Sequence, residues 1–370
     1  MAEPEASKKA GWRDRLRHAF AVEPDGPVEP DARERELIDG VLRRIVAREM
    51  AGPASLFLES WRPLGAVTGQ GMHALTPFVG VLMDADTWER LARYMQRRGA
   101  IPWMLDRLDA LQREASERAR ATTKSYLDIP YGPSAAERLD LFLPQSPCRG
   151  MLAFIHGGYW RSLDKRDFSF IAPPFVDSGY AVSVIGYALC PKVRIRDIVM
   201  QNVQAAAWLH RNASHFGVPQ VPLHFAGHSA GGHLATMLLA CQWNQYAADL
   251  PANLVGGALS ISGIYDLREI VKVPSINCDV HLDKASAAQA SPALMPTPSS
   301  TVLLTAVGEQ ENPGFHLQHR LIADRWTSAV RSSRICPGDN HFTVLDRLAD
   351  ASSALFGDAT RLIDGHFSRE

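Results

Sequence analysis

The sequence has few cysteines, no long apolar run and no excess of either charge. Its five cysteines are widely spaced and include no CxxC pair, so neither a thiolate zinc site nor a redox dithiol is expected. No apolar run approaches the ~20 residues that cross a bilayer. The 39 basic and 40 acidic residues give a net charge of −1. That balance argues against partners such as nucleic acid or an anionic membrane surface.

The N-terminal residues are charged and are not followed by the apolar segment of a secretory signal. We therefore expect a cytoplasmic protein with reduced thiols. Residues 1–32 are rich in proline and charged residues, which predicts a disordered tail with a short basic helix at 11–20.

Residues 33–124 predict a helical region. Apolar residues recur at helical spacing over 33–50, and two further helices are expected at 86–98 and 102–122. Glycine and proline interrupt the apolar segment 51–83, so its secondary structure is ambiguous. This region contains no motif that points to a function.

Short β-rich runs alternate with helical patterns after residue 125. Helices are expected at 198–211 and 232–241, and residues 273–300 look like an excursion beside a sheet. Strands are expected at 139–143, 151–155, 181–185, 222–226, 255–260, 302–307 and 334–336. This alternation predicts an α/β domain over 125–370, with a mostly parallel sheet covered by helices on both faces.

The strongest local motif is G-H-S-A-G at residues 227–231, between a predicted strand and an Ala/Leu-rich helix. This is the nucleophile elbow, in which Ser229 lies at the tip of a sharp, strained turn. Bulky side chains two residues before and after the serine would collide, so Gly227 and Gly231 are required. Ser229 is therefore the expected nucleophile.

A second motif, H-G-G-Y-W at residues 156–160, directly follows the strand expected at 151–155. Acyl transfer places negative charge on a carbonyl oxygen, and two backbone N–H groups must point at it. We assign one donor to Gly158 or Tyr159 and the other to Ala230. His156 and Gly157 are expected to support this loop.

The nucleophile needs a base, and the base needs an orienting acid, in the chain order serine, acid, histidine. His341 follows the last predicted strand and is the expected base. His316 and His319 lie in a helical pattern before that strand, and His366 is expected on the last helix. His228 and His233 flank the elbow, where packing or pocket roles are more common.

The acid should follow the strand at 302–307, where Glu309 and Glu311 both have suitable positions. Asp266 is an outside candidate that could equally cap a helix or brace a loop. A glutamate can replace the more usual aspartate because it only has to hold the imidazole and offset its charge.

Residues 125–370 resemble α/β-hydrolases, and in particular the kynurenine formamidase (arylformamidase) group and its bacterial esterase relatives. The likeness lies in HGGYW (156–160), YALCP (187–191), GHSAGGHL (227–234), SGIYDL (262–267), NHF (340–342) and G-x-x-E followed by F-H-x-Q (308–318). The last pattern favours Glu311 over Glu309 as the acid. The helical region 1–124 departs from the compact family pattern.

The resemblance and the motifs together predict a serine hydrolase that cleaves a small ester or amide without a metal or cofactor. The substrate would be an aryl formamide such as N-formylkynurenine, and Trp160 and Phe342 would line an aromatic pocket. A general short-acyl carboxylesterase and a non-catalytic binding protein on the same fold are the alternatives. Residues 1–124 could cap the site, bind a partner or form a homodimer contact.

Overall fold

The structure is a computed structural model that describes residues 29–47, 85–95, 97, 99–219 and 222–367. Contacts divide the chain into two compact units. The first comprises Met1–Gly40 and Leu58–Arg107, and the second comprises Val41–Phe57 and Leu108–Glu370. The motifs identified in the sequence all lie in the second unit.

The three helices predicted before residue 124 are confirmed. They are α2 (Ala32–Ala47), α6 (Ala85–Met95) and α7 (Ala100–Thr122). Within the first unit, the Arg107 guanidinium donates two hydrogen bonds of 2.7 Å to the Asp39 carboxylate. The basic helix predicted at 11–20 lies outside the described residues, and so does the segment 51–83.

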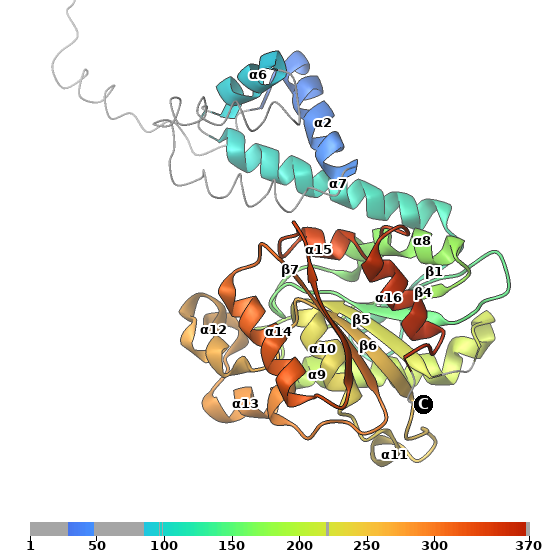
Figure 1. The fold of residues 1–370 in the computed structure, drawn as a ribbon. Helices are drawn as coiled ribbons and strands as arrows, with labels where there is room; N and C mark the ends of the chain where they lie inside the picture. The colour runs from blue at the N-terminus through green and yellow to red at the C-terminus, as the bar shows by residue number, and fades with distance from the viewer. Residues whose placement is uncertain (1–28, 48–84, 96, 98, 220–221, 368–370) are drawn as a thin grey trace, which may run out of the picture. The chain divides into compact units, whose positions relative to one another are not determined.

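An eight-stranded sheet forms the centre of the second unit, in the order β1-β2-β4-β3-β5-β6-β7-β8 (Figure 1). Strand β2 is antiparallel to both of its neighbours, and the remaining pairs are parallel. The predicted mostly parallel sheet is thus confirmed. The strands are β1 (Ser125–Pro130), β2 (Arg138–Phe142), β3 (Met151–Ile155), β4 (Ala181–Ile185), β5 (Leu223–His228), β6 (Val255–Ile261), β7 (Val302–Gly308) and β8 (Val330–Cys336).

The two edge strands are where the sequence prediction falls short. Strand β1 was not predicted, and β8 begins at Val330 rather than at residue 334. Both strands are largely exposed, so neither has the apolar run that identifies a buried strand. The pairing of β1 also shifts register between Tyr126 and Ile129, where Asp128 has a φ of 56°.

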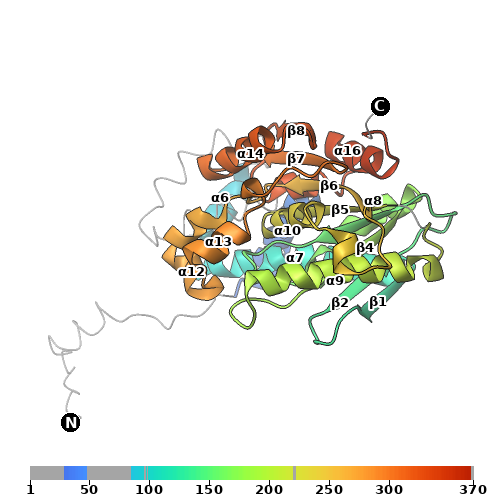
Figure 2. The ribbon, with the colours of Figure 1, turned by 90° about the horizontal axis from the view of Figure 1, so that it is seen from below.

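Two hydrophobic clusters cover the two faces of the sheet, because successive side chains of each strand point to opposite faces. Ala153 of β3 lies in one cluster, together with side chains of α9, α10 and α14. Its neighbours Leu152 and Phe154 lie in the other, together with side chains of α8 and α16. Figure 2 shows the sheet between these helices, with β1 at one edge and β8 at the other.

The helices of the second unit connect these strands or follow them. The segment 273–300, expected as an excursion, contains two short α-helices and a 3₁₀ turn. His366 lies in a turn beyond the last helix, not on it as predicted, because that helix ends at Ile363. The α-helices are α8 (Ala172–Asp177), α9 (Ile195–Asn212), α10 (Ala230–Leu239), α11 (Trp243–Tyr246), α12 (Pro274–Val280), α13 (Lys284–Gln289), α14 (Pro313–Arg325), α15 (Thr343–Asp346) and α16 (Ala354–Ile363). The 3₁₀ helices are η2 (Lys165–Ile171), η3 (Ala213–Phe216), η4 (Leu267–Lys272) and η5 (Pro292–Leu294).

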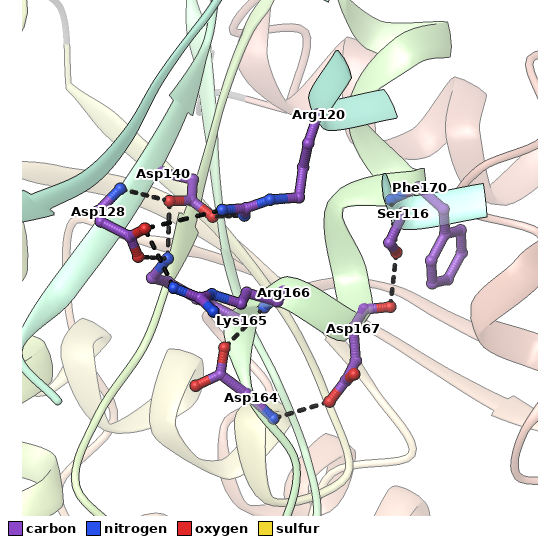
Figure 3. A network of polar contacts seen from close by, with 9 residues as sticks. All are labelled: Ser116, Arg120, Asp128, Asp140, Asp164, Lys165, Arg166, Asp167 and Phe170. Carbon is purple, nitrogen blue, oxygen red and sulfur yellow. Dashed lines mark hydrogen bonds and ion pairs between the residues drawn. The ribbon is translucent and has the colours of Figure 1, made fainter. Parts of the chain in front are cut away.

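Four charged side chains form a cluster beside β2, which we call the ion cluster: Arg120, Asp128, Asp140 and Lys165 (Figure 3). The Asp140 carboxylate is fully buried and accepts hydrogen bonds from Arg120 and, at 2.7 Å, from Lys165. Lys165 also donates to Asp128 at 2.7 Å. Asp128 reaches the cluster because of its irregular backbone in β1, and its own N–H donates to Asp140 at 2.8 Å.

The end of α7 is joined to η2 near the ion cluster. The Ser116 hydroxyl donates to the carbonyl of Asp167 at 2.8 Å and accepts from the N–H of Phe170 at 3.2 Å (Figure 3). Arg120 adds a charged contact from the same helix. The last turns of α7 therefore belong to the second unit and hold the segment that follows the H-G-G-Y-W loop.

Candidate active site

Ser229 lies at the turn between β5, which ends at His228, and α10, which begins at Ala230. Its φ of 57° and ψ of −118° are strained values for a residue with a side chain. A Cβ on Gly227 would lie 2.1 Å from the Gly231 carbonyl oxygen, and a Cβ on Gly231 would lie 2.0 Å from the Ile155 carbonyl oxygen. The two glycines are therefore required by this turn, as the motif predicts.

The loop that follows β3 lies directly against the turn of Ser229. A Cβ on Gly157 would lie 2.8 Å from the His228 carbonyl oxygen and 3.2 Å from the Ser229 Cβ atom. The backbone N–H groups of Gly158, Tyr159 and Ala230 donate to no acceptor among the described residues. Three donors are thus available beside the serine, from the two segments that the sequence predicts.

His156 begins this loop and is buried in the core. Its ring stacks on Tyr187 with centroids 4.2 Å apart, and the Tyr187 hydroxyl donates to the His156 carbonyl at 2.8 Å. Burial lowers the pKa of His156 to about 4, so the ring is neutral at pH 7. His156 is therefore a buried, neutral ring packed against Tyr187, and its role in support of the loop stays a prediction.

His341 and Glu311 are in direct contact, from two different loops at the carboxyl ends of β7 and β8. The distance between His341 Nδ1 and Glu311 Oε2 is 2.7 Å. Phe315 stacks on the His341 ring with centroids 4.1 Å apart. The imidazole is therefore fixed on one nitrogen and on one face, which leaves Nε2 for a reaction partner.

Glu311 is stabilised as a carboxylate. Burial acts to raise its pKa, but hydrogen bonds from His341, Ser262 and the Gly308 N–H outweigh burial, so the pKa lies below its usual value. Ser262 donates at 2.5 Å and the Gly308 N–H at 2.7 Å, both to Oε1. The charged carboxylate can thus stabilise a protonated His341.

The two other acid candidates have different partners. Glu309 Oε2 accepts from the Gly338 N–H at 2.8 Å, which ties two loops together. Asp266 caps η4 and forms an ion pair with Arg268, in agreement with the alternative role of a helix cap. Of the three candidates, Glu311 is the one that the structure joins to His341.

His228 links the turn of Ser229 to the loop of His341. Its Nε2 lies 2.6 Å from the His341 carbonyl oxygen, and because a carbonyl only accepts, Nε2 carries the proton. Burial, and then the nearby His341, lower the pKa of His228 to about 3. The neutral ring thus holds the backbone of His341 beside the elbow.

The two residues predicted to line an aromatic pocket, Phe342 and Trp160, differ in their exposure. Phe342 is 45% exposed and contacts the His341 ring edge-on, at 5.5 Å between centroids. Trp160 is fully buried in the core cluster, so its side chain packs inside the domain and does not face an open pocket. Trp160 is buried because it packs into the apolar core beneath the loop, whereas Phe342 lies at the surface.

Several residues that hold the site were not predicted in the roles that they have. Tyr187, Ser262 and Gln318 were included only as members of motifs, and His228 and His233 only as packing or pocket residues. Gln318 accepts the N–H groups of Tyr265 and Asp266, both at 2.8 Å, and so fixes the loop that follows Ser262. Each of these residues lies within a segment that carries the family resemblance. Position within a family motif was therefore the signal that could have identified these residues. A motif does not show, however, which atoms each side chain contacts.

A polar cavity of about 550 Å³ lies beside the ion cluster, and none of the site residues described above lines it. Its walls come mostly from charged side chains of α7, β1, β2 and the start of η2, with two alanines from the β1–β2 turn. It is therefore distinct from the predicted substrate pocket.

Two features are absent from the described ranges: a cluster of metal ligands and a membrane-spanning helix. No three histidine, cysteine, aspartate or glutamate side chains in those ranges are grouped as ligands for a metal ion. None of the helices described is long and apolar enough to cross a membrane.

Comparison with known sequences gives consistent matches. The family model BD-FAE matches residues 139–294. Kynurenine formamidase from Danio rerio is 30% identical over 256 residues, which are 66% of this chain and 83% of that protein. Kynurenine formamidase from Salmo salar is 30% identical over 284 residues, which are 72% of this chain and 92% of that protein.

Solved structures agree with the sequence matches. A candidate thioesterase from a Silicibacter species has a TM-score of 0.61 and 30% identity, and the match covers 68% of this chain and 92% of that one. An esterase from Pyrobaculum calidifontis, with a TM-score of 0.55 and 17% identity, covers 71% and 92% and shows the fold alone. The fold and the arrangement of residues define an α/β-hydrolase. Within that class, the chain belongs to the kynurenine formamidase family, and the protein is a hydrolase of small ester or amide substrates.

Proposed function

We propose that the protein is a serine hydrolase with Ser229 as nucleophile, His341 as general base and Glu311 as orienting acid. The observation that carries this proposal is the 2.7 Å hydrogen bond between His341 and Glu311, beside a serine held in a strained turn. No hydrogen bond joins the side chains of Ser229 and His341, although both residues are described. Such contacts commonly tighten only when substrate is bound.

In the proposed reaction, Ser229 Oγ attacks the carbonyl carbon while its proton moves to His341 Nε2. Glu311 holds the proton on Nδ1 and stabilises the imidazolium that forms. The imidazolium then gives its proton to the leaving group, and an acyl-enzyme remains. Water attacks that ester with His341 again as base, which releases the acid and restores the Ser229 hydroxyl.

The negative charge of the tetrahedral intermediates would lie on the carbonyl oxygen of the substrate. Its proposed donors are the N–H groups of Ala230 and of Gly158 or Tyr159, which have no acceptor within the described protein. Donors that are already in place need no reorganisation during the reaction, and each contributes strongly to the rate.

As substrate we propose an aryl formamide such as N-formylkynurenine. The names of the two relatives from fish support this choice, and so does the exposed ring of Phe342 next to His341. Cleavage would transfer the formyl group to Ser229, release the aryl amine and then release formate. We further propose that residues 125–370 form the catalytic domain, and that a homodimer contact is one role for residues 1–124.

A short-acyl carboxylesterase is the second candidate. It is favoured by the candidate thioesterase, which is as similar in sequence as the formamidases and has a matching fold. An ester also has a better leaving group than an amide and depends less on protonation by His341. A non-catalytic binding protein is disfavoured, because Ser229, His341 and Glu311 are all present.

The test is hydrolysis of N-formylkynurenine and of p-nitrophenyl acetate by wild type and by Ser229→Ala. We expect formamide cleavage that is lost in Ser229→Ala and retained in Ser214→Ala, a control at an exposed serine. Cleavage of the ester alone, still dependent on Ser229, would support the carboxylesterase instead. Absence of both activities in folded protein would contradict the proposal and favour a binding protein.

A further inference from the structure

The loop beside Ser229 has an unusual backbone. Gly158, Tyr159 and Trp160 have φ values of 99°, 49° and 58°, so three consecutive residues are in the left-handed region. Residues with a side chain rarely adopt this conformation, and such strain persists only where the surroundings enforce it. Because this loop supplies proposed oxyanion donors, whatever enforces its conformation also aims those donors.

The side chain of Trp160 anchors the loop. It is fully buried, and its indole N–H donates to His233 Nδ1 at 3.2 Å. The two rings meet edge-on, with centroids 5.2 Å apart. A backbone contact adds to this, because the Trp160 carbonyl accepts from the Cys190 N–H at 2.8 Å.

His233 lies in the first turn of α10, and its own N–H donates to the Ser229 carbonyl at 3.1 Å. Its Nε2 lies 2.7 Å from the Ala290 carbonyl, so Nε2 carries the proton and Nδ1 is free to accept from Trp160. Burial lowers the pKa of His233 to about 4, which keeps the ring in this neutral form at pH 7.

We propose that His233 is a positioning residue, which fixes the oxyanion loop relative to Ser229 through the indole of Trp160. This inference rests on the proposed function and extends it, because it assigns a role to a histidine outside the three reacting residues. One residue joins three segments: its backbone N–H contacts the nucleophile turn, and its ring contacts the oxyanion loop and the C-cap of α13 at Ala290. Loss of its acceptor would let the Tyr159–Trp160 backbone relax and turn the donors away from the substrate oxygen.

The test compares His233→Leu, His233→Asn and Trp160→Phe by steady-state kinetics on p-nitrophenyl acetate. Leucine removes the acceptor, whereas the asparagine oxygen lies close to the position of Nδ1 and retains it. We expect kcat to fall about 30-fold in His233→Leu and Trp160→Phe with KM nearly unchanged, because misplaced donors affect the transition state more than substrate binding. His233→Asn should recover most of the lost kcat. The double variant His233→Leu/Trp160→Phe should be no slower than either of its single variants.

His224→Leu is the matched control. His224 is also a buried histidine with a lowered pKa, but it lies near the start of β5, away from the elbow. We expect this variant to be less stable but to keep its kcat. Wild-type kcat in His233→Leu and Trp160→Phe would overturn the inference. An equal loss in His233→Asn, or in His224→Leu, would do the same, because packing alone would then explain the effect. If the wild-type protein shows no hydrolysis that depends on Ser229, that result would instead refute the proposed function.

Discussion

The surroundings of Ser229 and the ion cluster are both rich in buried polar side chains. The two regions differ in how these side chains are stabilised away from water. Around Ser229, His156, His228 and His233 are kept neutral, and one ring nitrogen of each bonds to a backbone carbonyl. In the ion cluster, Asp140 is a buried carboxylate held between Lys165 and Arg120.

This difference follows from what each region has to do. Neutral histidines orient loops without adding charge, so the field at the serine is set by Glu311 and by backbone dipoles. The ion cluster holds β1, β2, η2 and α7 together. Charged side chains can do this because no reaction takes place beside them. The comparison predicts that substitutions near Ser229 reduce the rate, whereas substitutions in the ion cluster reduce stability.

The largest expected effect on rate outside Ser229 and His341 is that of Glu311→Gln. The amide of glutamine donates to Nδ1 and so forces the proton onto Nε2, where the ring can no longer act as base. We expect kcat/KM to fall by about 10⁴-fold, with little change in the unfolding midpoint. Glu309→Gln is the control and should retain nearly wild-type activity. Similar losses in both variants would contradict the assignment.

In the ion cluster, Lys165→Met should have the opposite outcome. It leaves Asp140 fully buried with Arg120 as its remaining cation. We expect the free energy of unfolding in urea to fall by about 3–5 kcal/mol, while kcat of the folded fraction changes little. Arg166→Met, at an exposed side chain, should change stability by less than about 0.5 kcal/mol. A large loss of kcat in folded Lys165→Met would break the comparison.

Ser262→Ala tests how much the hydrogen bond from Ser262 stabilises the Glu311 carboxylate. It removes one of the hydrogen bonds that keep the carboxylate charged, while the bond from the Gly308 N–H remains. We expect kcat/KM to decrease by about tenfold, as for loss of one hydrogen bond to a charged group. Ser183→Ala, at another buried serine, should leave kcat/KM unchanged. Equal activity of Ser262→Ala and wild type would show that the Gly308 N–H is sufficient.

The last prediction concerns the pH dependence of stability. The pKa of His233 is about 4 in the folded protein against 6.5 for an ordinary histidine, so between these values the unfolded chain binds the extra proton. Stability therefore falls as the pH drops from 6.5 towards 4, by up to about 1.4 kcal/mol per pH unit for such a histidine. Urea unfolding at several pH values should give a shallower slope for His233→Asn. Ser183→Ala, which removes no titratable group, should keep the wild-type slope, and an unchanged slope in His233→Asn would contradict the account.

The two regions also differ in how far the sequence predicts them. Ser229 and its glycines lie within five residues, and the chain order of the elbow, the acid loop and the histidine loop is enough to single out His341. The ion cluster joins residues from α7, β1, β2 and η2 that stand in ordinary polar segments. Nothing in the sequence marks Asp128 or Lys165, and β1 was missed because its side chains are mostly exposed. Trp160 was correctly placed in the loop, but the direction of its side chain depends on core packing.

The central claim is that Ser229 carries the acyl group during hydrolysis. The most direct measurement is mass spectrometry of the intact protein, followed by peptide mapping, after brief reaction with p-nitrophenyl acetate and acid quenching. The account predicts one acetyl group per chain, on the peptide that contains Ser229, and no such adduct in Ser229→Ala. An adduct on another residue, or turnover of the ester with no adduct on Ser229 at any quench time, would contradict it.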